Sequence, residues 1–400
     1  MALQSLFEPN GNPVVQYVRV SGFKLKAGSV VPQARIGFCV WGEPGRPLIV
    51  VHPGVAGSPK ARVVEEQAYA EGWWTHHIGP GRLLDTDIFQ VVCFGHFGGN
   101  GPSSTADELS DCLQELNVLD TSWLAARALK EVGVTSIHAA IGTSMGAAMA
   151  REWLFQQQVA VRHVVEVFGK YGNNHYGSPA VCSHKIHYDI LTTKGDNLDD
   201  IKRRFVECFG PMRDETHAFS VVYDHVLSAF DSLYERVTDR QALSVGRMAG
   251  YFRFVTPLYF QQKWDAIFAK TLDRAQADQE MRQMMDRLAD AFMATFKRTS
   301  YASLRHMDAQ PNIISPRVVA DALKAQNAGL MTVVVRGDRL YNPDLQIDEF
   351  CKIRDQLPAA SKSKMKLHIC HNELRGHDHF LSEEFEGDAQ VIKEFLCASL

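Results

Sequence analysis

The sequence has no long apolar run. No stretch approaches the roughly 20 apolar residues that a membrane-spanning helix needs, and the N-terminal segment lacks the basic start and apolar core of a secretory signal peptide. A strong charge of either sign is also missing, because 42 lysines and arginines oppose 46 acidic residues, giving a net charge of −4. This balance does not favour a nucleic-acid partner or an anionic membrane. We therefore expect a soluble, cytoplasmic protein that binds neither.

Paired cysteines and the usual metal-binding motifs are missing as well. The eight cysteines are scattered with no C-x-x-C pair, and Cys39 and Cys93 lie inside apolar segments. We expect these cysteines to be reduced core residues rather than disulfides or zinc ligands. Sixteen histidines are present, but there is no H-E-x-x-H motif and no carboxylate lies at ligand spacing. We therefore predict no metal site.

Apolar residues themselves are plentiful. Hydrophobic residues make up 46% of the 400-residue chain and charged residues 22%, which is ordinary for a protein with a large core. Short apolar runs, typical of strands buried on both faces, alternate with segments of helical spacing. This alternation predicts an α/β fold with a mostly parallel sheet and helices on both faces. The expected strands are residues 15–20, 34–41, 47–52, 88–94, 161–168, 330–335 and 365–369, the first two antiparallel at one edge; the expected helices are 116–132 and 389–400.

The alternation stops near residue 172 and resumes near residue 316. The intervening chain is polar, aromatic and helical in spacing. One amphipathic helix is expected where apolar residues fall on a single face: Met281, Met284, Met285, Leu288 and Phe292. We therefore predict an α/β core formed by residues 1–171 and 317–400, with a helical cap, residues 172–316, inserted between them.

The most informative motif is Gly142-Thr-Ser-Met-Gly146. An apolar, β-compatible segment precedes it and a small-residue, helix-favouring segment follows it. A G-x-S-x-G at such a strand-to-helix corner is typical of a nucleophile elbow, in which the tight turn requires glycine and exposes the serine hydroxyl. A glycine-rich turn without catalytic meaning would match the same pattern, but the strand–helix context favours the elbow. Ser144 is therefore the predicted nucleophile.

A serine nucleophile needs a histidine base and a carboxylate that orients it, both following later strands. In this fold the serine comes first along the chain, then the aspartate or glutamate, and then the histidine. Asp338 follows the predicted strand 330–335, at the edge where open α/β sheets place their ligands. A turn or capping role is the alternative for this aspartate. Three histidines after strand 365–369 compete for the base. We favour His377 because it follows a glycine in a loop, and His371 and His379 remain alternatives.

Several motifs occur together in one order along most of the chain. They are Gly72-Trp-Trp74, Ile78-Gly-Pro-Gly81, Leu84-Asp-Thr-Asp87, Gly101-Pro-Ser-Ser104, Gly142–Gly146, Asp338-Arg-Leu340 and Gly376-His-Asp378 with Phe380-Leu381. In this combination the chain resembles the homoserine O-acetyltransferase family of α/β-hydrolase-fold acyltransferases and related esterases. The resemblance implies that Ser144 is acylated, that His377 is the base and that Asp338 orients it.

The resemblance also implies residues that bind the substrate. The oxyanion donors would be the backbone N–H groups of Gly54 and Met145, while Arg247 and Asp378 would line the site of the acceptor. The implied donor is acyl-CoA, above all acetyl-CoA, acting as a co-substrate with no bound cofactor, and a homodimer is compatible with the family.

The chain departs from the family just after Arg247, where a Tyr-Arg pair is replaced by Phe254 and Val255. The loss of an arginine at this point predicts poorer binding of an amino-acid acceptor.

Three functions are compatible with these residues. In the first, an acyltransferase, the acyl group passes from a thioester to Ser144 and then to a hydroxyl acceptor. In the second, a carboxylesterase of short-chain acyl esters, water takes the acyl group from the same intermediate. The third is a binding protein on an inactive hydrolase fold, which the ordered serine, aspartate and histidine argue against. We favour the acyltransferase, with the esterase as the alternative.

Overall fold

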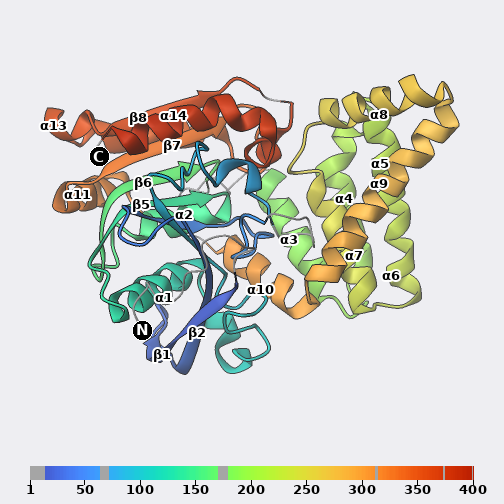
Figure 1. The fold of residues 1–400 in the computed structure, drawn as a ribbon. Helices are drawn as coiled ribbons and strands as arrows, with labels where there is room; N and C mark the ends of the chain where they lie inside the picture. Colours follow the sequence, from blue (N-terminus) through green and yellow to red (C-terminus); the bar gives the residue numbers. More distant parts are fainter. Residues whose placement is uncertain (1–13, 64–71, 170–178, 311–313, 373, 399) are drawn as a thin grey trace.

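The computed structural model describes residues 14–63, 72–169, 179–310, 314–372, 374–398 and 400 (Figure 1). Its centre is an eight-stranded sheet in the order β1-β2-β4-β3-β5-β6-β7-β8. The strands are β1 (Gln16–Lys24), β2 (Val30–Trp41), β3 (Leu48–His52), β4 (Gln90–Phe94), β5 (Ser136–Thr143), β6 (Ala160–Val167), β7 (Gly329–Val335) and β8 (Met365–Cys370). Strand β2 pairs antiparallel with β1 and β4, and the strands from β4 to β8 pair in parallel. The predicted α/β class and the antiparallel edge are confirmed.

Successive residues of the central strands face opposite sides of the sheet, and both sides are buried. Val50 and Ala140 belong to one core cluster, whereas their neighbours Val51 and Ile141 belong to the other. Burial on both faces explains why these strands appear in the sequence as nearly continuous apolar runs. Every residue of β3 and β4 is buried.

Helices cover both faces of the sheet. Residues of α1 (Val118–Glu131), α2 (Met145–Glu152), α11 (Pro316–Gln326) and α12 (Pro343–Asp355) pack on one face, and residues of α14 (Glu386–Cys397) pack on the other. The remaining short helices are α13 (Ala359–Lys362) and the 3-10 helices η2 (Thr75–His77), η3 (Ser110–Glu115), η4 (Gly210–Glu215), η5 (Gly376–Leu381) and η6 (Glu383–Phe385).

The described residues form eight further helices between β6 and β7. They are α3 (Pro179–Thr192), α4 (Leu198–Phe209), α5 (His217–Ala229), α6 (Asp231–Glu235), α7 (Asp239–Tyr251), α8 (Pro257–Thr271), α9 (Arg274–Thr295) and α10 (Arg298–Ala309). Most of them share an aromatic core of their own around Phe205, Phe219 and Phe252, into which α9 inserts Met281 and Met285. Figure 1 shows α4 to α9 gathered to one side of the sheet, with α3 and α10 between.

The C-terminal end of this helical segment packs against the core on the sheet side. Helix α10 joins the core on the sheet side through Tyr301, Leu304 and Met307, as does α11, which begins at Pro316. Residue 172, the first residue of the predicted cap, lies outside the described residues. The division into a core and a cap with these bounds stays a prediction.

Two predictions from composition can be checked against the described residues. None of their helices is both long and apolar enough to span a bilayer. Seven cysteines have described side chains and none of them forms a disulfide, so the expectation of no disulfides is confirmed for these residues. The expectation that all are core residues is wrong for Cys351, which is exposed.

Candidate active site

Ser144 lies at a sharp corner between β5 and α2. Its backbone adopts φ 55° and ψ −122°, a conformation that is costly for a residue with a side chain. The flanking glycines are required by space, since a Cβ on Gly142 would lie 1.9 Å from the carbonyl oxygen of Gly146. A Cβ on Gly146 would lie 2.2 Å from the carbonyl oxygen of His52. The geometry is that of the predicted nucleophile elbow.

The three side chains predicted to act together are in contact. Nε2 of His377 lies 2.8 Å from Oγ of Ser144, and Nδ1 lies 2.8 Å from Oδ2 of Asp338. The other carboxylate oxygen of Asp338 accepts hydrogen bonds from the backbone N–H groups of Leu340, at 2.7 Å, and Tyr341, at 2.9 Å. With Nδ1 protonated and directed at the carboxylate, Nε2 is free to accept the serine proton. All three side chains are buried.

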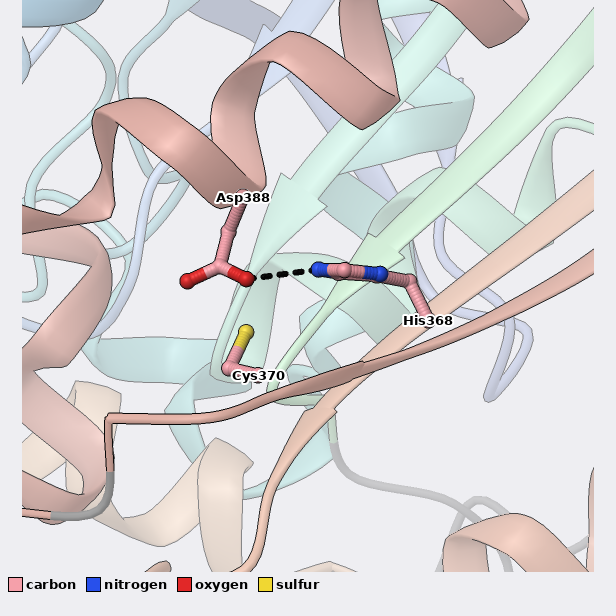
Figure 2. Close-up of side chains that lie close together, drawn as sticks. All are labelled: His368, Cys370 and Asp388. Carbon is pink, nitrogen blue, oxygen red and sulfur yellow. Dashed lines mark hydrogen bonds and ion pairs between the residues drawn. The ribbon is translucent and has the colours of Figure 1, made fainter.

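The two alternative histidines lie elsewhere. His371 is exposed after β8, and Nε2 of His379 bonds to Oδ2 of Asp388 at 3.0 Å. The other oxygen of Asp388 accepts a hydrogen bond from Nε2 of His368 at 2.6 Å, as Figure 2 shows. Of the three candidate histidines, His377 is the one whose ring contacts Ser144, and its role as the base stays a prediction.

Three side chains of this cluster, His368, Cys370 and Asp388, are of types that can bind metal. Donor atoms of His368, Cys370 and Asp388 lie within 4.8 Å of one another, and their side chains converge in Figure 2. Burial raises the pKa of Asp388, but hydrogen bonds from His368 and His379 outweigh burial and hold the pKa below its usual range. Burial also raises the pKa of the Cys370 thiol far above its usual value, which keeps the thiol protonated. We interpret the group as a hydrogen-bonded cluster that anchors η5, and the absence of a metal site stays a prediction.

Both predicted oxyanion donors are next to Ser144. The loop after β3 passes so close that a Cβ on Gly54 would lie 3.3 Å from Cβ of Ser144 and 3.8 Å from Oγ. The carbonyl of Gly54 accepts a hydrogen bond from Nε2 of His96 at 2.9 Å, which holds this loop. Met145 is the first residue of α2, where backbone N–H groups have no intrahelical acceptor and suit an anion.

The predicted acceptor-binding residues lie in the same region. Arg247, on α7, is 5% exposed, and its guanidinium lies over the rings of Phe292, at 5.2 Å, and Phe254, at 5.4 Å. Burial raises the pKa of Asp378, and the nearby positive charges of Arg247 and then of His377 oppose that rise. The guanidinium of Arg247 and the carboxylate of Asp378 are thus close enough for their charges to interact.

Comparison with known proteins agrees with this geometry. No family model matches the chain. A serine O-succinyltransferase of Emericella nidulans is 31% identical over 148 residues, which are 34% of this chain and 28% of that protein. A homoserine O-acetyltransferase of Methanobrevibacter ruminantium is 22% identical over 383 residues, which are 90% of this chain and 68% of that protein. These relatives support the resemblance of the chain to homoserine O-acetyltransferases and related acyltransferases.

Solved structures show that this fold extends over nearly the whole chain. The homoserine O-acetyltransferase of Bacillus anthracis superposes with a TM-score of 0.68 at 13% identity, covering 96% of this chain and 97% of that one. Esterase E22 superposes with a TM-score of 0.66 at 17% identity, covering 96% of this chain and 100% of that one. Both are α/β-hydrolase-fold enzymes. The match to the fungal serine O-succinyltransferase, by contrast, spans less than a third of that relative's length.

The departure from the family after Arg247 has a structural counterpart. Phe254 packs on the imidazole of His377 with 6.0 Å between ring centroids, and Val255 is buried. Arg253, which the sequence did not single out, is 2% exposed and donates to Nδ1 of His187 at 3.2 Å. A guanidinium is therefore present one residue before the apolar pair.

A second buried arginine was also missed. Arg305 forms an ion pair with Asp308 at 3.0 Å, with both side chains at most 1% exposed. Burial, and then repulsion from Arg305, lowers the pKa of Arg253 to about 9. Burial and the same repulsion hold the pKa of His187 well below its usual value. Arg305 and Asp308 are three residues apart on α10, a spacing that could have suggested an ion pair, but nothing in the sequence showed that it is buried.

Tyr341 connects this charged group with the triad. Its ring lies edge-on to the imidazole of His377, with centroids 5.3 Å apart and the planes at 76°. Its hydroxyl donates to Oδ1 of Asp308 at 3.2 Å. Tyr341 directly follows the motif Asp338-Arg-Leu340. The motif therefore indicated that Tyr341 lies near Asp338, but not which side chains it contacts.

Proposed function

We propose that this protein is a serine-dependent O-acyltransferase. It moves an acyl group, acetyl in the simplest case, from acyl-CoA through an acyl-Ser144 intermediate to a hydroxyl acceptor. The observation that carries the proposal is the unbroken contact from Ser144 through His377 to Asp338, with 2.8 Å at each step. Such an arrangement activates a hydroxyl that is otherwise a weak nucleophile at neutral pH.

In the first half-reaction, Nε2 of His377 takes the proton of Ser144 while Oγ attacks the thioester carbonyl. The carbonyl oxygen becomes negatively charged and accepts hydrogen bonds from the backbone N–H groups of Gly54 and Met145. Collapse of this intermediate breaks the carbon–sulfur bond, and the thiol leaves with the proton from His377. Asp338 stabilises the imidazolium that exists between the two proton transfers.

In the second half-reaction, His377 takes a proton from the acceptor hydroxyl, which attacks the acyl carbon. The bond to Oγ breaks and Ser144 regains its proton from His377. Asp378 and Arg247 are the groups that would hold an amino-acid acceptor, its ammonium and its carboxylate respectively. Homoserine, the acceptor named for many relatives, is the first acceptor to test.

Transfer to an acceptor requires that water be kept from the acyl-enzyme. The helical segment between β6 and β7 supports this exclusion of water because it contacts the loop that leads to His377. In this contact the hydroxyl of Thr256 donates a hydrogen bond to the carbonyl of Leu374 at 2.5 Å. His377 is 2% exposed beneath these contacts. Closing this region around the substrate favours acyl transfer over hydrolysis.

The alternative is a carboxylesterase of short-chain esters that uses the same triad. One observation favours it: the apolar ring of Phe254 packs beside His377. An apolar wall suits a neutral ester or alcohol better than a zwitterion, because a buried unpaired charge is costly.

The test combines mass spectrometry with product analysis. Wild-type protein mixed with acetyl-CoA should gain one acetyl group on Ser144, and adding homoserine should discharge it to O-acetylhomoserine. The Ser144→Ala variant should show neither reaction while keeping its melting temperature. Acetylation without discharge to homoserine, together with fast hydrolysis of p-nitrophenyl acetate, would make the esterase the better description. Acetylation at another residue, or an active alanine variant, would contradict both.

A further inference from the structure

Tyr341 is in contact with the nucleophile as well as with the base. Its side chain is fully buried, and besides its bond to Asp308 the hydroxyl lies within hydrogen-bonding reach of the side chain of Ser144. The usual triad needs only the serine, the histidine and the aspartate. The hydroxyl of Tyr341 is therefore a group close to the reacting oxygen that the usual triad does not include.

We propose that Tyr341 is a further catalytic residue, whose hydroxyl donates a hydrogen bond to Oγ of Ser144 while that oxygen carries negative charge. This inference rests on the proposed function, since it requires Ser144 to be the nucleophile.

The hydroxyl of Tyr341 has a single hydrogen, so it can serve only one acceptor at a time. In the resting site, Ser144 directs its own proton at His377 and Tyr341 directs its proton at Asp308. The bond to Asp308 measures 3.2 Å, which is long beside the usual value of about 2.7–2.8 Å for an O–H···O bond. Once His377 has taken the serine proton, Oγ becomes the stronger acceptor, and the tyrosine hydrogen turns towards it.

Asp308 tolerates the loss of this hydrogen bond because Arg305 remains paired with it at 3.0 Å. The backbone of Tyr341 is also fixed, since its N–H donates to Asp338 at 2.9 Å. The hydroxyl is thus held within reach of Oγ before the reaction begins. Such preorganised donors contribute most to catalysis in buried sites.

Tyr341 acts here as a hydrogen-bond donor and transfers no proton. Burial, and then the negative charge of Asp308, raises its pKa well above the usual value, so the hydroxyl stays protonated at neutral pH. The serine proton still moves to His377 and from there to the leaving group. The proton of Tyr341 is on the same oxygen before and after each half-reaction.

The test is the Tyr341→Phe variant, which keeps the ring on His377 and removes only the hydroxyl. Oγ is the attacking atom in acylation and the leaving atom in deacylation, so both rate constants should fall by about 10- to 100-fold. KM should stay within about twofold, since the hydroxyl does not act on the bound ground state. The shape of the pH–rate profile should not change, because Tyr341 does not titrate in the working range. Stopped-flow acylation with p-nitrophenyl acetate and with acetyl-CoA measures these quantities.

Two further variants separate the possible outcomes. Tyr223→Phe removes a buried hydroxyl from the aromatic core of the helical segment, and it should leave both rate constants unchanged. Ser144→Ala tests the proposed function itself, and an active alanine variant would overturn that function. If Ser144→Ala is inactive while Tyr341→Phe keeps wild-type acylation and deacylation rates, only the role of Tyr341 is overturned. A loss confined to KM, or a shifted alkaline limb of the pH profile, would also overturn it.

Discussion

The backbone N–H of Asp378 donates a hydrogen bond to the backbone carbonyl of Phe254 at 3.2 Å. Asp378 directly follows His377, whereas Phe254 lies in the helical segment just after α7. The ring of Phe254 also packs on the imidazole, so this segment holds the turn that carries the base by both main chain and side chain. We therefore expect activity to depend on the position of the helical segment.

The first prediction concerns the carboxylate that orients the base. Asp338→Asn should lower kcat by about 10⁴-fold, because the amide no longer holds His377 in the tautomer that accepts the serine proton. The fold should persist, since the amide oxygen can still accept the N–H groups of Leu340 and Tyr341. Asp344→Asn, at an aspartate whose side chain is 77% exposed, is the matched control and should be fully active. Equal activity of the two variants would show that the acid lies elsewhere.

The second prediction concerns the tight corner around the nucleophile. Gly146→Ala should destabilise the protein by about 3 kcal/mol or more, because its Cβ would meet the backbone oxygens of His52, at 2.2 Å, and Pro53, at 2.7 Å. Gly387→Ala is the control: it lies in α14 with no atom within 4 Å of the new Cβ. This second alanine should change the free energy of unfolding by less than about 1 kcal/mol. Denaturant unfolding of both variants measures the difference, and similar stabilities would contradict the geometry of the elbow.

The third prediction concerns the acceptor. Arg247→Met should raise KM for homoserine by about tenfold or more, the cost of losing a charge-assisted hydrogen bond to its carboxylate. Hydrolysis of p-nitrophenyl acetate, which has no carboxylate, should change by less than about threefold. Arg240→Met, on the same helix with its side chain 77% exposed, should alter neither. An equal loss with both substrates would instead assign Arg247 a structural role.

The fourth prediction concerns acid stability. Burial lowers the pKa of several histidines, to about 3 for His52 and to about 4 for His77, His96 and His163. In the unfolded chain these groups titrate near 6.5. Between these values the unfolded state binds more protons than the folded state, so the free energy of unfolding must decrease as the pH falls from about 6.5 to about 4.

Denaturant titrations across this pH range measure the slope. Each buried histidine contributes up to about 1.4 kcal/mol per pH unit. His163→Gln should reduce the proton uptake on unfolding by about one, whatever its effect on absolute stability. A slope that does not change in this variant would show that His163 is already protonated in the folded protein.

Much of the fold was predictable because its signals are local. Strands β3 and β4 are buried on both faces, so each appears as a short apolar run. The predicted strands begin one and two residues before the observed ones and end at the same residues. The elbow was predictable for a similar reason. A corner that leaves no space for a Cβ at Gly142 or Gly146 must be glycine in the sequence.

The sequence by itself determined the fold class and the tight corner that carries the candidate nucleophile, because periodicity and steric limits act between near neighbours. Only the tertiary structure decided which histidine pairs with the serine, since His377 and Ser144 lie 233 residues apart. The same holds for Tyr341 and Asp308, which are 33 residues apart and meet in the interior. Contacts of this kind depend on how strands are ordered and how helices pack on them, and no local pattern encodes that packing.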